Sequence, residues 1–402
     1  MKKLLFFAIL WLCSAEPYFS ISVQVAIPDA TLQRIQTTDP DNFIEVSHLD
    51  LTYPIVQHLT ILLIRTMEYR DTCLFFLRNA EIFDYQVEQS FQHDFASVPW
   101  FKDRIDQPTL PLDGLYHSIG MGEGVDLIVV DSGINRNHDE FVGRVTQLWR
   151  VPGEPETPCG MHGSWVASIA AGSTIGIASR SRIFDIRVAR NSLGCSFFTS
   201  DAINGLLAAI NNLEVTSWGN VTRPSVINLS WIGPGNSIID TLTGILFDMG
   251  VVVVAAAGNS HSSLEPCAYS PSRGNKVVSV GATTQSDRVA SFSNYGNCVD
   301  IFAPGVGIVG AVHDMDSGFI VEDGTSASAP IVSGIAAVLY SRENFDQAAQ
   351  VTDLMRHLSV WGVIKDLDLQ SPNRLANFYP IVEAEHPVAT PSPNGASLKS
   401  VF

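Results

Sequence analysis

The chain has few charged residues and lacks any run of basic ones. Of its 402 residues, 16% are Asp, Glu, Lys or Arg, and the formal net charge is −17. Nucleic-acid partners favour a basic patch, because contacts to phosphates need Lys and Arg side chains. No Lys/Arg-rich run occurs along this chain. We therefore expect no nucleic-acid partner.

Apolar runs long enough to cross a bilayer, which needs about 18 residues, are also absent. The chain opens with "MKKLLFFAILWLCSA", in which Lys2 and Lys3 precede an apolar stretch over 4–13, followed by small residues. That layout is typical of a secretory signal, and a non-cleaved anchor is the alternative. We predict a signal peptide over 1–15, an extracellular location and no membrane partner.

Cysteine is scarce, with six in the chain. Cys13 would leave with the signal, and Cys73 lies in the N-terminal third. The other four are Cys159, Cys195, Cys267 and Cys298. Since none forms a C-x-x-C pair, a structural zinc site is not expected. In an oxidising compartment four cysteines suggest two disulfides, and the sequence alone allows three pairings.

With 46% hydrophobic residues, the chain has enough apolar side chains for a folded core. From about residue 97, short apolar runs such as "VDLIVV" (125–130) and "VVVVAA" (251–256) alternate with helical patterns such as "GSWVASIAAG" (163–172). This alternation predicts an α/β fold with a doubly wound, mostly parallel sheet. In residues 16–92, short apolar runs alternate with acidic and polar stretches. This different pattern predicts a small separate module. Residues 381–402, rich in Pro, Ala and Ser, predict a flexible tail.

The stretch "DGTSASAPIVSGIAAVLY" (323–340) combines small polar residues with a helical apolar pattern. Pro330 is tolerated only in the first turn of a helix, so the helix should begin near Ser326. The hydroxyl of Ser326 would then lie at the positive end of the helix dipole. The ordinary role of such a serine is a helix cap, and this stretch alone does not exclude it.

Three other polar residues fall at the ends of predicted elements. Asp131 ends an apolar run, His162 opens a helical pattern and Asn259 follows "VVVVAAAG". Each has an ordinary alternative: a turn acid, a packed core histidine and a turn asparagine. In a doubly wound sheet, however, reactive groups gather at the carboxyl ends of the strands.

Together these residue types suffice for nucleophilic acyl transfer. A serine hydroxyl needs an adjacent base, and histidine can take its proton and return it. A carboxylate holds the imidazole in the required tautomer. Asn259 and the backbone N–H of Ser326 can donate hydrogen bonds to an oxyanion.

Several ordered motifs carry a family resemblance. The most specific are "VVDSGINRNHDEFVGR" (129–144), "HGSWVASIAAG" (162–172) and "GTSASAPIVSGIAAVL" (324–339). Over roughly residues 55–378, the chain resembles the subtilisin-like serine proteases (peptidase S8) of the proteinase K branch, which carry an inhibitor-type propeptide. The resemblance implies a subtilisin-like α/β fold preceded by a small α+β pro-segment.

The resemblance assigns roles to individual residues. It implies Asp131, His162 and Ser326 as the catalytic triad and Asn259 as the oxyanion donor. "NLSWIG" (228–233) resembles the strand that pairs with the substrate backbone. The implied substrate-binding residues are Ser230, Trp231, Ile232, Ala257 and Gly258. The implied disulfides are Cys159–Cys195 and Cys267–Cys298, with Cys73 unpaired.

The resemblance also implies a division of the chain. Residues 16–92 would be an inhibitory propeptide, 93–380 the catalytic domain, and self-cleavage would fall near 92–93. The alternative is that 16–92 form an extra subdomain of one domain. The implied partners are a protein or peptide substrate and the chain's own propeptide, and we expect a monomer.

Some positions depart from the family pattern. Met161 stands where glycine is usual, Trp165 where a second histidine is common, and Ala327 where methionine is frequent. Met161 and Trp165 could crowd the imidazole. Trp231 and Ile232 replace smaller residues, so we expect narrowed subsites and a restricted cleavage preference.

Two further expectations concern a cofactor and a modification. Thr284 stands where relatives often have an acidic calcium ligand, and calcium needs several oxygens including carboxylates. We therefore expect no calcium at that place and no cofactor. Asn220 lies in the sequon "NVT" (220–222) and is a candidate for glycosylation, whereas Asn228 lies in a predicted buried strand.

The sequence as a whole predicts a secreted serine endopeptidase made as an autoprocessed zymogen. The competing hypothesis is a self-cleaving member that stays blocked by its propeptide and acts as a binding or regulatory protein.

Overall fold

The computed structural model describes residues 98–214, 221–263, 265–343 and 345–379, and four short strands that precede them. These strands are β1 (Leu5–Phe6), β2 (Val25–Ala26), β3 (Glu81–Ile82) and β4 (Ser90–Phe91). The chain divides into two compact units, Met1–Asn79 and Ala80–Phe402. In the first unit β1 and β2 pair antiparallel. The remainder of the predicted signal peptide and propeptide, and the whole predicted tail, lie outside the described residues.

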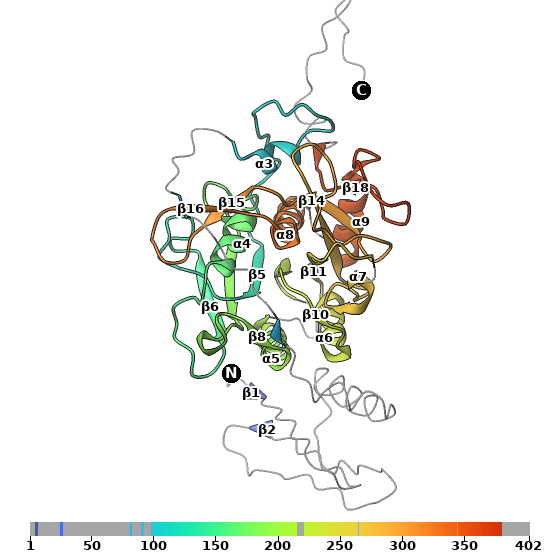
Figure 1. Cartoon of the computed structure of the whole chain (residues 1–402). Helices are drawn as coiled ribbons and strands as arrows, with labels where there is room; N and C mark the ends of the chain where they lie inside the picture. The colour runs from blue at the N-terminus through green and yellow to red at the C-terminus, as the bar shows by residue number, and fades with distance from the viewer. Residues whose placement is uncertain are drawn as a thin grey trace, which may run out of the picture. The chain divides into compact units, whose positions relative to one another are not determined.

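A nine-stranded sheet forms the centre of the second unit, with strand order β17-β18-β14-β13-β11-β9-β5-β7-β6 (Figure 1). All neighbours are parallel except β17 and β18. The strands are β5 (Asp126–Asp131), β6 (Val145–Arg150), β7 (Arg182–Arg187), β9 (Ser225–Leu229), β11 (Val251–Ala256), β13 (Val278–Thr283), β14 (Ile301–Pro304), β17 (Val360–Trp361) and β18 (Arg374–Leu375). The central strands are continuous apolar runs because a parallel sheet is covered on both faces.

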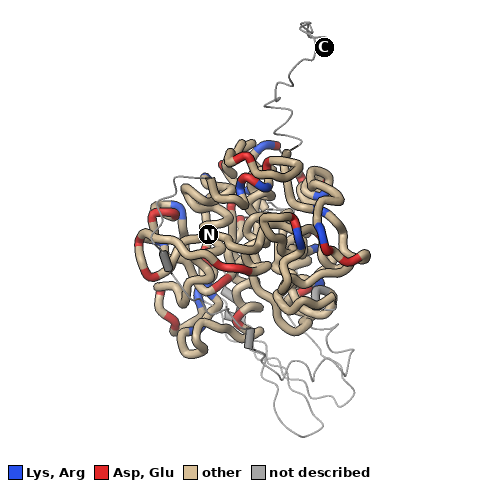
Figure 2. The backbone as a smooth tube through the Cα atoms, turned by 45° about the horizontal axis from the view of Figure 1, so that its top comes forward, with Lys and Arg blue, Asp and Glu red and all other residues tan. Residues whose placement is uncertain are grey.

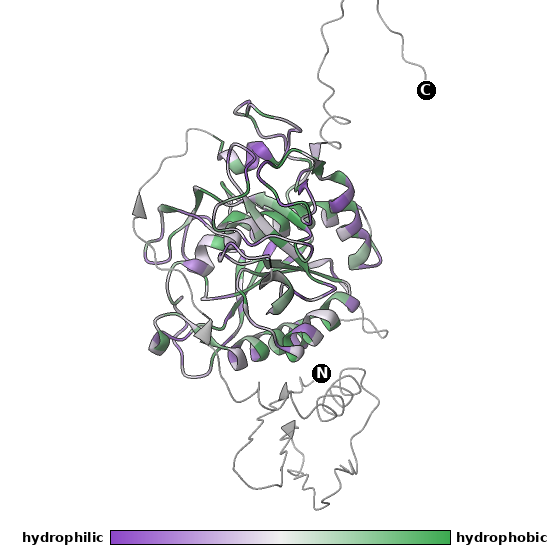
Figure 3. Cartoon of the chain, turned by 45° about the vertical axis from the view of Figure 1, so that its right-hand side comes forward, coloured by the Kyte–Doolittle hydropathy of each residue, from purple (hydrophilic) through white to green (hydrophobic). Residues whose placement is uncertain are grey.

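Successive side chains of one strand reach opposite layers of helices. Val129 of β5 belongs to the core cluster that includes α4 (His162–Ala171) and α8 (Thr325–Arg342). The next residue, Val130, lies beside Gly205 of α5 (Thr199–Asn212). The prediction of a doubly wound, mostly parallel α/β fold is therefore confirmed. Figure 3 shows the apolar sides of the helices facing the sheet.

The remaining elements surround this sheet. The helices are α3 (Trp100–Arg104), α6 (Ser237–Asp248), α7 (Glu265–Ala268), α9 (Ala348–Leu358) and the 3-10 turn η1 (Asn191–Leu193). The short strands are β8 (Phe197–Phe198), β10 (Gly233–Pro234), β12 (Tyr269–Ser270), β15 (Ile308–Ala311) and β16 (Phe319–Glu322). No helix in the described part of the chain is both long and apolar enough to cross a membrane. Figure 2 shows short acidic and basic stretches scattered along a described backbone that is mostly uncharged.

Two strands from the predicted propeptide pair with strands of this unit. β3 pairs antiparallel with β8, and β4 pairs antiparallel with β16. Both contacts are main-chain ladders, so they depend little on side-chain identity. Residues 81–82 and 90–91 thus each add a short strand to a strand of this unit.

Helix α8 begins at Thr325, one residue before the predicted start, and contains Pro330. A proline has no N–H, so the carbonyl oxygen four residues earlier, that of Ser326, loses its helical donor. The hydroxyl of Ser230 supplies the replacement, donating to the Ser326 carbonyl at 2.9 Å. Because of Pro330, the Ser326 carbonyl oxygen accepts from the Ser230 hydroxyl and not from a helical N–H. This hydrogen bond connects the loop after β9 to α8.

Candidate active site

Asp131 and His162 form a hydrogen-bonded pair. β5 ends at Asp131, α4 begins at His162, and the imidazole Nδ1 lies 2.9 and 3.0 Å from the two carboxylate oxygens. The Asp131 side chain is 4% exposed, and its carboxylate also accepts from the backbone N–H of Ser132 at 2.6 Å. A carboxylate can only accept, so Nδ1 carries the proton and Nε2 is the basic nitrogen of the ring. This is the tautomer that a general base requires.

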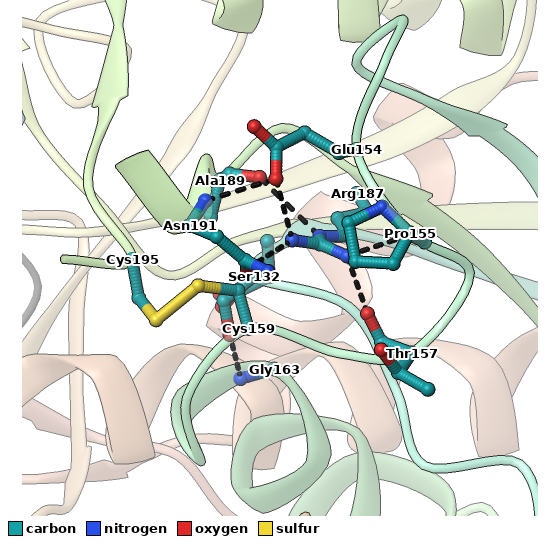
Figure 4. Close-up of a disulfide and its surroundings, with 11 residues drawn as sticks. Ser132, Glu154, Pro155, Thr157, Cys159, Gly163, Arg187, Ala189, Asn191 and Cys195 are labelled. Atoms are coloured by element: carbon teal, nitrogen blue, oxygen red, sulfur yellow. Dashed lines mark hydrogen bonds and ion pairs between the residues drawn. A yellow bond between two sulfur atoms is a disulfide. The ribbon is translucent and has the colours of Figure 1, made fainter. Parts of the chain in front are cut away.

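The loop after β5 fixes the start of α4 (Figure 4). The Ser132 hydroxyl accepts from the N–H of Gly163 at 2.9 Å, and the Ser132 carbonyl accepts from the N–H of Cys159 at 2.9 Å. A Cβ at position 163 would lie 2.3 Å from the Gly133 carbonyl oxygen. Only glycine therefore lets the helix approach the loop closely enough for His162 to reach Asp131.

Arg187, at the end of β7, organises the neighbouring loops from a fully buried position (Figure 4). Its guanidinium donates to the carbonyl oxygens of Pro155 and Thr157, and to the side chains of Glu154 and Asn191. These loops lead into Cys159 and Cys195, which form a disulfide with Cα atoms 5.3 Å apart. In the chain-entropy model a closed loop of this length stabilises the fold by about 3–4 kcal/mol.

Ser326 lies at the start of α8 beside the segment after β9. Its hydroxyl donates to the Ser230 carbonyl oxygen at 3.0 Å, while the Ser230 hydroxyl donates to the Ser326 carbonyl. Ser326 shares a small pocket with His162 and Asn259. The pocket is lined by Met161, His162, Trp165, Asn259, Ile320, Glu322, Asp323 and Ser326. The structure therefore brings the predicted nucleophile, base and oxyanion donor to one pocket, and Asp131 is bonded to the base.

The amide of Asn259 is oriented by Thr325. Asn259 Oδ1 accepts from the Thr325 backbone N–H at 2.9 Å and from the Thr325 hydroxyl at 2.8 Å. A Cβ at Gly324 would lie 3.4 Å from Asn259 Nδ2 and 3.5 Å from the Ser326 backbone nitrogen. The two nitrogens therefore border one space, which stays open because residue 324 has no side chain. Two N–H donors around one space can hold an anionic oxygen.

The predicted substrate-binding residues follow β9 and β11, and Trp231 does not lie as expected. Its side chain is 6% exposed, its indole N–H donates to the Val130 carbonyl at 2.9 Å, and its ring meets Phe197 edge-to-face at 5.5 Å. The expectation that Trp231 narrows the subsites is therefore wrong, because its bulk is packed into the protein. Ile232 is half-buried and lies against Gly258.

Met161 and Trp165 lie beside the imidazole. The Trp165 ring centroid is 5.9 Å from that of His162, and its indole N–H donates to the Ile308 carbonyl at 3.1 Å. Met161 lines the same pocket. Both residues thus form a wall next to the base, and neither interrupts the bond between His162 and Asp131.

Glu322 is a site residue that the sequence reading missed. It lines the pocket with His162 and Ser326. Burial and the neighbouring Asp323 raise the pKa of the Glu322 carboxyl, whereas His162 lowers it. The sequence does place two carboxylates, Glu322 and Asp323, directly before "GTS" (324–326). Nothing in the sequence, however, indicates that Glu322 lies near His162.

The remaining predicted positions lie away from this pocket. Cys267 and Cys298 form a second disulfide, with Cα atoms 5.3 Å apart. Thr284 contacts Ser286, and the two carboxylate oxygens of the nearby Asp287 accept from the buried Arg104 at 2.7 and 3.0 Å. Within the described residues no three His, Cys, Asp or Glu side chains are grouped to hold a metal. Asn220 lies outside the described residues.

Comparisons with known proteins agree with this geometry. A family model described as "Subtilase family" matches residues 122–378. An extracellular serine proteinase of Thermus sp. (strain Rt41A) is 37% identical over 70% of this chain and 66% of its own length. Alkaline serine exoprotease A of Vibrio alginolyticus is 37% identical over 75% of this chain and 55% of its own. The matched part thus spans less than two thirds of either relative.

A solved structure gives the same result in three dimensions. The crystal structure of a cold-adapted subtilisin-like serine proteinase superimposes with a TM-score of 0.64 and 35% sequence identity, covering 70% of this chain and 98% of the other. The α/β fold and its site thus define a class, the subtilisin-like proteins. The chain belongs to the subtilase family.

Proposed function

We propose that this chain is a secreted serine endopeptidase of the proteinase K branch, made as an autoprocessed zymogen. Asp131, His162 and Ser326 are its catalytic triad, and Asn259 donates to the oxyanion. The observation that carries the proposal is the Asp131–His162 hydrogen bond next to a pocket that Ser326 and Asn259 share. The extracellular serine proteinase of Thermus supports both the activity and the secretion.

The reaction follows from these contacts. His162 Nε2 takes the proton of the Ser326 hydroxyl, and the oxygen attacks the carbonyl carbon of the scissile peptide bond. The new oxyanion accepts from Asn259 Nδ2 and the Ser326 N–H. The imidazolium, stabilised by Asp131, then protonates the leaving amine. Water hydrolyses the acyl-enzyme by the same proton path in reverse.

The Ser326 hydroxyl, which donates to the Ser230 carbonyl without substrate, would turn toward His162 when peptide binds. The peptide's own N–H competes for the same carbonyl oxygen. The main chain of 230–232 then acts as an additional strand for the substrate, reading it through backbone hydrogen bonds.

Residues 16–92 are proposed as the inhibitory propeptide, after a signal over 1–15 and before a catalytic domain over 93–380. The support is the pairing of β3 with β8 and of β4 with β16. β16 carries Ile320 and Glu322, which line the pocket. A segment paired there lies next to the site, where self-cleavage near 92–93 would release it. We propose a monomer whose partners are a protein or peptide substrate and this propeptide.

We also propose that no calcium binds at Thr284. A calcium site needs carboxylate oxygens, and the nearby Asp287 carboxylate is already paired with Arg104. Addition of EDTA should leave the melting temperature of the mature protein within about 2 °C, since one lost kcal/mol shifts it by a few degrees. A larger drop would contradict this assignment.

A serine-reactive fluorophosphonate tests the activity. Wild-type mature protein should be labelled and should digest a denatured protein, and Ser326→Ala should do neither. Ser341→Ala, at the far end of the same helix, is the matched control because its hydroxyl donates locally, to the Val338 carbonyl. N-terminal sequencing of the mature chain tests the processing site. A folded wild type that cleaves itself and is never labelled would contradict the endopeptidase and favour a blocked regulator.

A further inference from the structure

Ile232 and Gly258 meet next to the proposed nucleophile. A Cβ at position 258 would lie 2.4 Å from Ile232 Cδ1, so the end methyl of the isoleucine rests on the bare backbone of Gly258. Ile232 lies two residues after Ser230, whose carbonyl contacts Ser326, and Gly258 directly precedes Asn259. The contact therefore joins the segment that contains Ser230 to the segment that contains Asn259. Both segments place polar groups near the Ser326 hydroxyl.

The proposed function fixes where a substrate residue must lie, and the inference rests on it. The attacked carbonyl carbon lies at Ser326 Oγ, and its oxygen lies between Asn259 Nδ2 and the Ser326 N–H. The N–H of the same residue can reach the Ser230 carbonyl, which is 3.0 Å from Ser326 Oγ. With these three points fixed, the side chain of the acyl residue enters between segments 230–232 and 257–259.

Both sides of this gap are held firmly. On one side, Trp231 is anchored through its indole to Val130, and Gly233 pairs with Ser270. On the other side, the Gly258 N–H donates to the Thr325 hydroxyl at 3.0 Å, and its carbonyl accepts from the N–H of Asn294 at 2.9 Å. Ile232 therefore cannot be moved aside by a shift of either segment without breaking several bonds.

We propose that Ile232 fills the subsite of the acyl residue, so that the peptidase cleaves after glycine or alanine and rejects larger side chains. A larger side chain would have to displace the Ile232 methyl from Gly258, and overpacking of a fixed site is unfavourable. Trp231, the other bulky residue of the segment, points into the protein. The restriction is thus assigned to Ile232 alone.

Two fluorogenic peptides that differ only in Ala or Phe as the acyl residue test the assignment. One methylene that does not fit a pocket changes kcat/KM by about 10–200-fold. Wild type should therefore show a kcat/KM ratio of at least about 100 in favour of the Ala peptide. Ile232→Gly should raise kcat/KM for the Phe peptide by about 100-fold. The readout is the ratio of kcat/KM for the two peptides, because any loss of main-chain binding that the variant causes affects both peptides alike.

Ile232→Ala should give an intermediate ratio and serves as the second variant if Ile232→Gly does not fold. The matched control is Ile238→Ala, a half-buried isoleucine on α6 that belongs to neither segment 230–232 nor segment 257–259, and it should keep the wild-type ratio. Efficient wild-type cleavage after Phe would overturn the proposal, as would an unchanged ratio in folded Ile232→Gly and Ile232→Ala.

Fluorophosphonate labelling separates this proposal from the function on which it rests. The reagent needs the nucleophile and not the acyl-residue subsite. Labelled protein that hydrolyses both peptides equally overturns the role of Ile232 and leaves the endopeptidase intact. Protein that is neither labelled nor able to hydrolyse any peptide, in wild type and both variants, overturns the endopeptidase and this role together.

Discussion

Ser230 and Ser326 are tied by two reciprocal hydrogen bonds. The hydroxyl of each residue donates to the carbonyl oxygen of the other, at 2.9 and 3.0 Å. One of these carbonyls is available because Pro330 cannot donate to it within α8. The proline in the first turns of the helix and the serine after β9 therefore act together to position the proposed nucleophile.

The first prediction is that Ser230 and Pro330 are energetically coupled. Ser230→Ala removes the donor to the Ser326 carbonyl and the acceptor of the buried Asn228 amide, and should lower the free energy of unfolding by about 1–3 kcal/mol. Adding Pro330→Ala restores a helical N–H and should reduce that loss. Urea unfolding of the two single variants and the double variant gives the coupling energy, expected at about 1 kcal/mol. Strict additivity would contradict the shared acceptor.

The second prediction concerns the acid limb of the pH–rate profile. An ionised Glu322 near His162 favours the imidazolium, so Glu322→Gln should make the imidazole easier to deprotonate. The acid limb of kcat/KM should then move to lower pH by about half a unit. Asp248→Asn, an exposed acid at the end of α6, is the charge-matched control and should leave the limb in place. A shift to higher pH would exclude this coupling.

The third prediction concerns the buried ion pair of Arg104 and Asp287. Arg104 is fully buried and donates through two nitrogens to both carboxylate oxygens, while Asp287 is 4% exposed. Arg104→Ala leaves a buried carboxylate unpaired and should lower the free energy of unfolding by about 3–5 kcal/mol. The exposed pair of Arg180 and Glu123 provides the control. Arg180→Ala should change the free energy of unfolding by less than about 1 kcal/mol. Equal effects in urea unfolding would contradict the role of burial.

The ends of elements were predictable from sequence because they depend on local patterns. Asp131 ends a run of buried apolar residues, and His162 begins a helix whose next two residues, Gly163 and Ser164, are small. Pro330 located the start of α8 to within one residue, although it lies in the second turn, where its missing N–H deprives the Ser326 carbonyl of a helical donor.

Side-chain direction was not predictable where it depends on distant contacts. The partner of the Trp231 indole is Val130, 101 residues away in sequence. The local sequence is therefore equally compatible with a tryptophan that lines a cleft and with one that is buried in the core. Glu322 is likewise remote from His162 in sequence, and only the fold brings them to one pocket. Arg187 gave no signal either, because Glu154, Pro155 and Thr157, three of its partners, lie 30 or more residues away in sequence.

The fourth prediction is that Asp185 makes the fold less stable as the pH rises. Asp185 lies on β7, is 1% exposed and accepts from Gln147 Nε2 at 2.9 Å. Burial raises its pKa from 3.8 to about 7. Between about pH 4 and pH 7 the folded chain therefore binds a proton that the unfolded chain releases, and stability falls across this window.

Asp185→Asn replaces the carboxyl with a neutral group of the same shape that can still accept from Gln147. The variant should exceed the free energy of unfolding of wild type by about 1 kcal/mol at pH 4.5 and by about 4 kcal/mol at pH 8, because each unit between the two pKa values, 3.8 and about 7, corresponds to about 1.4 kcal/mol. Urea unfolding in a Ser326→Ala background, which removes the proposed nucleophile, with and without Asp185→Asn, measures this difference without self-digestion. Parallel stability curves for the two proteins from pH 4.5 to 8 would show that Asp185 is ionised in the folded chain throughout, contrary to the burial argument.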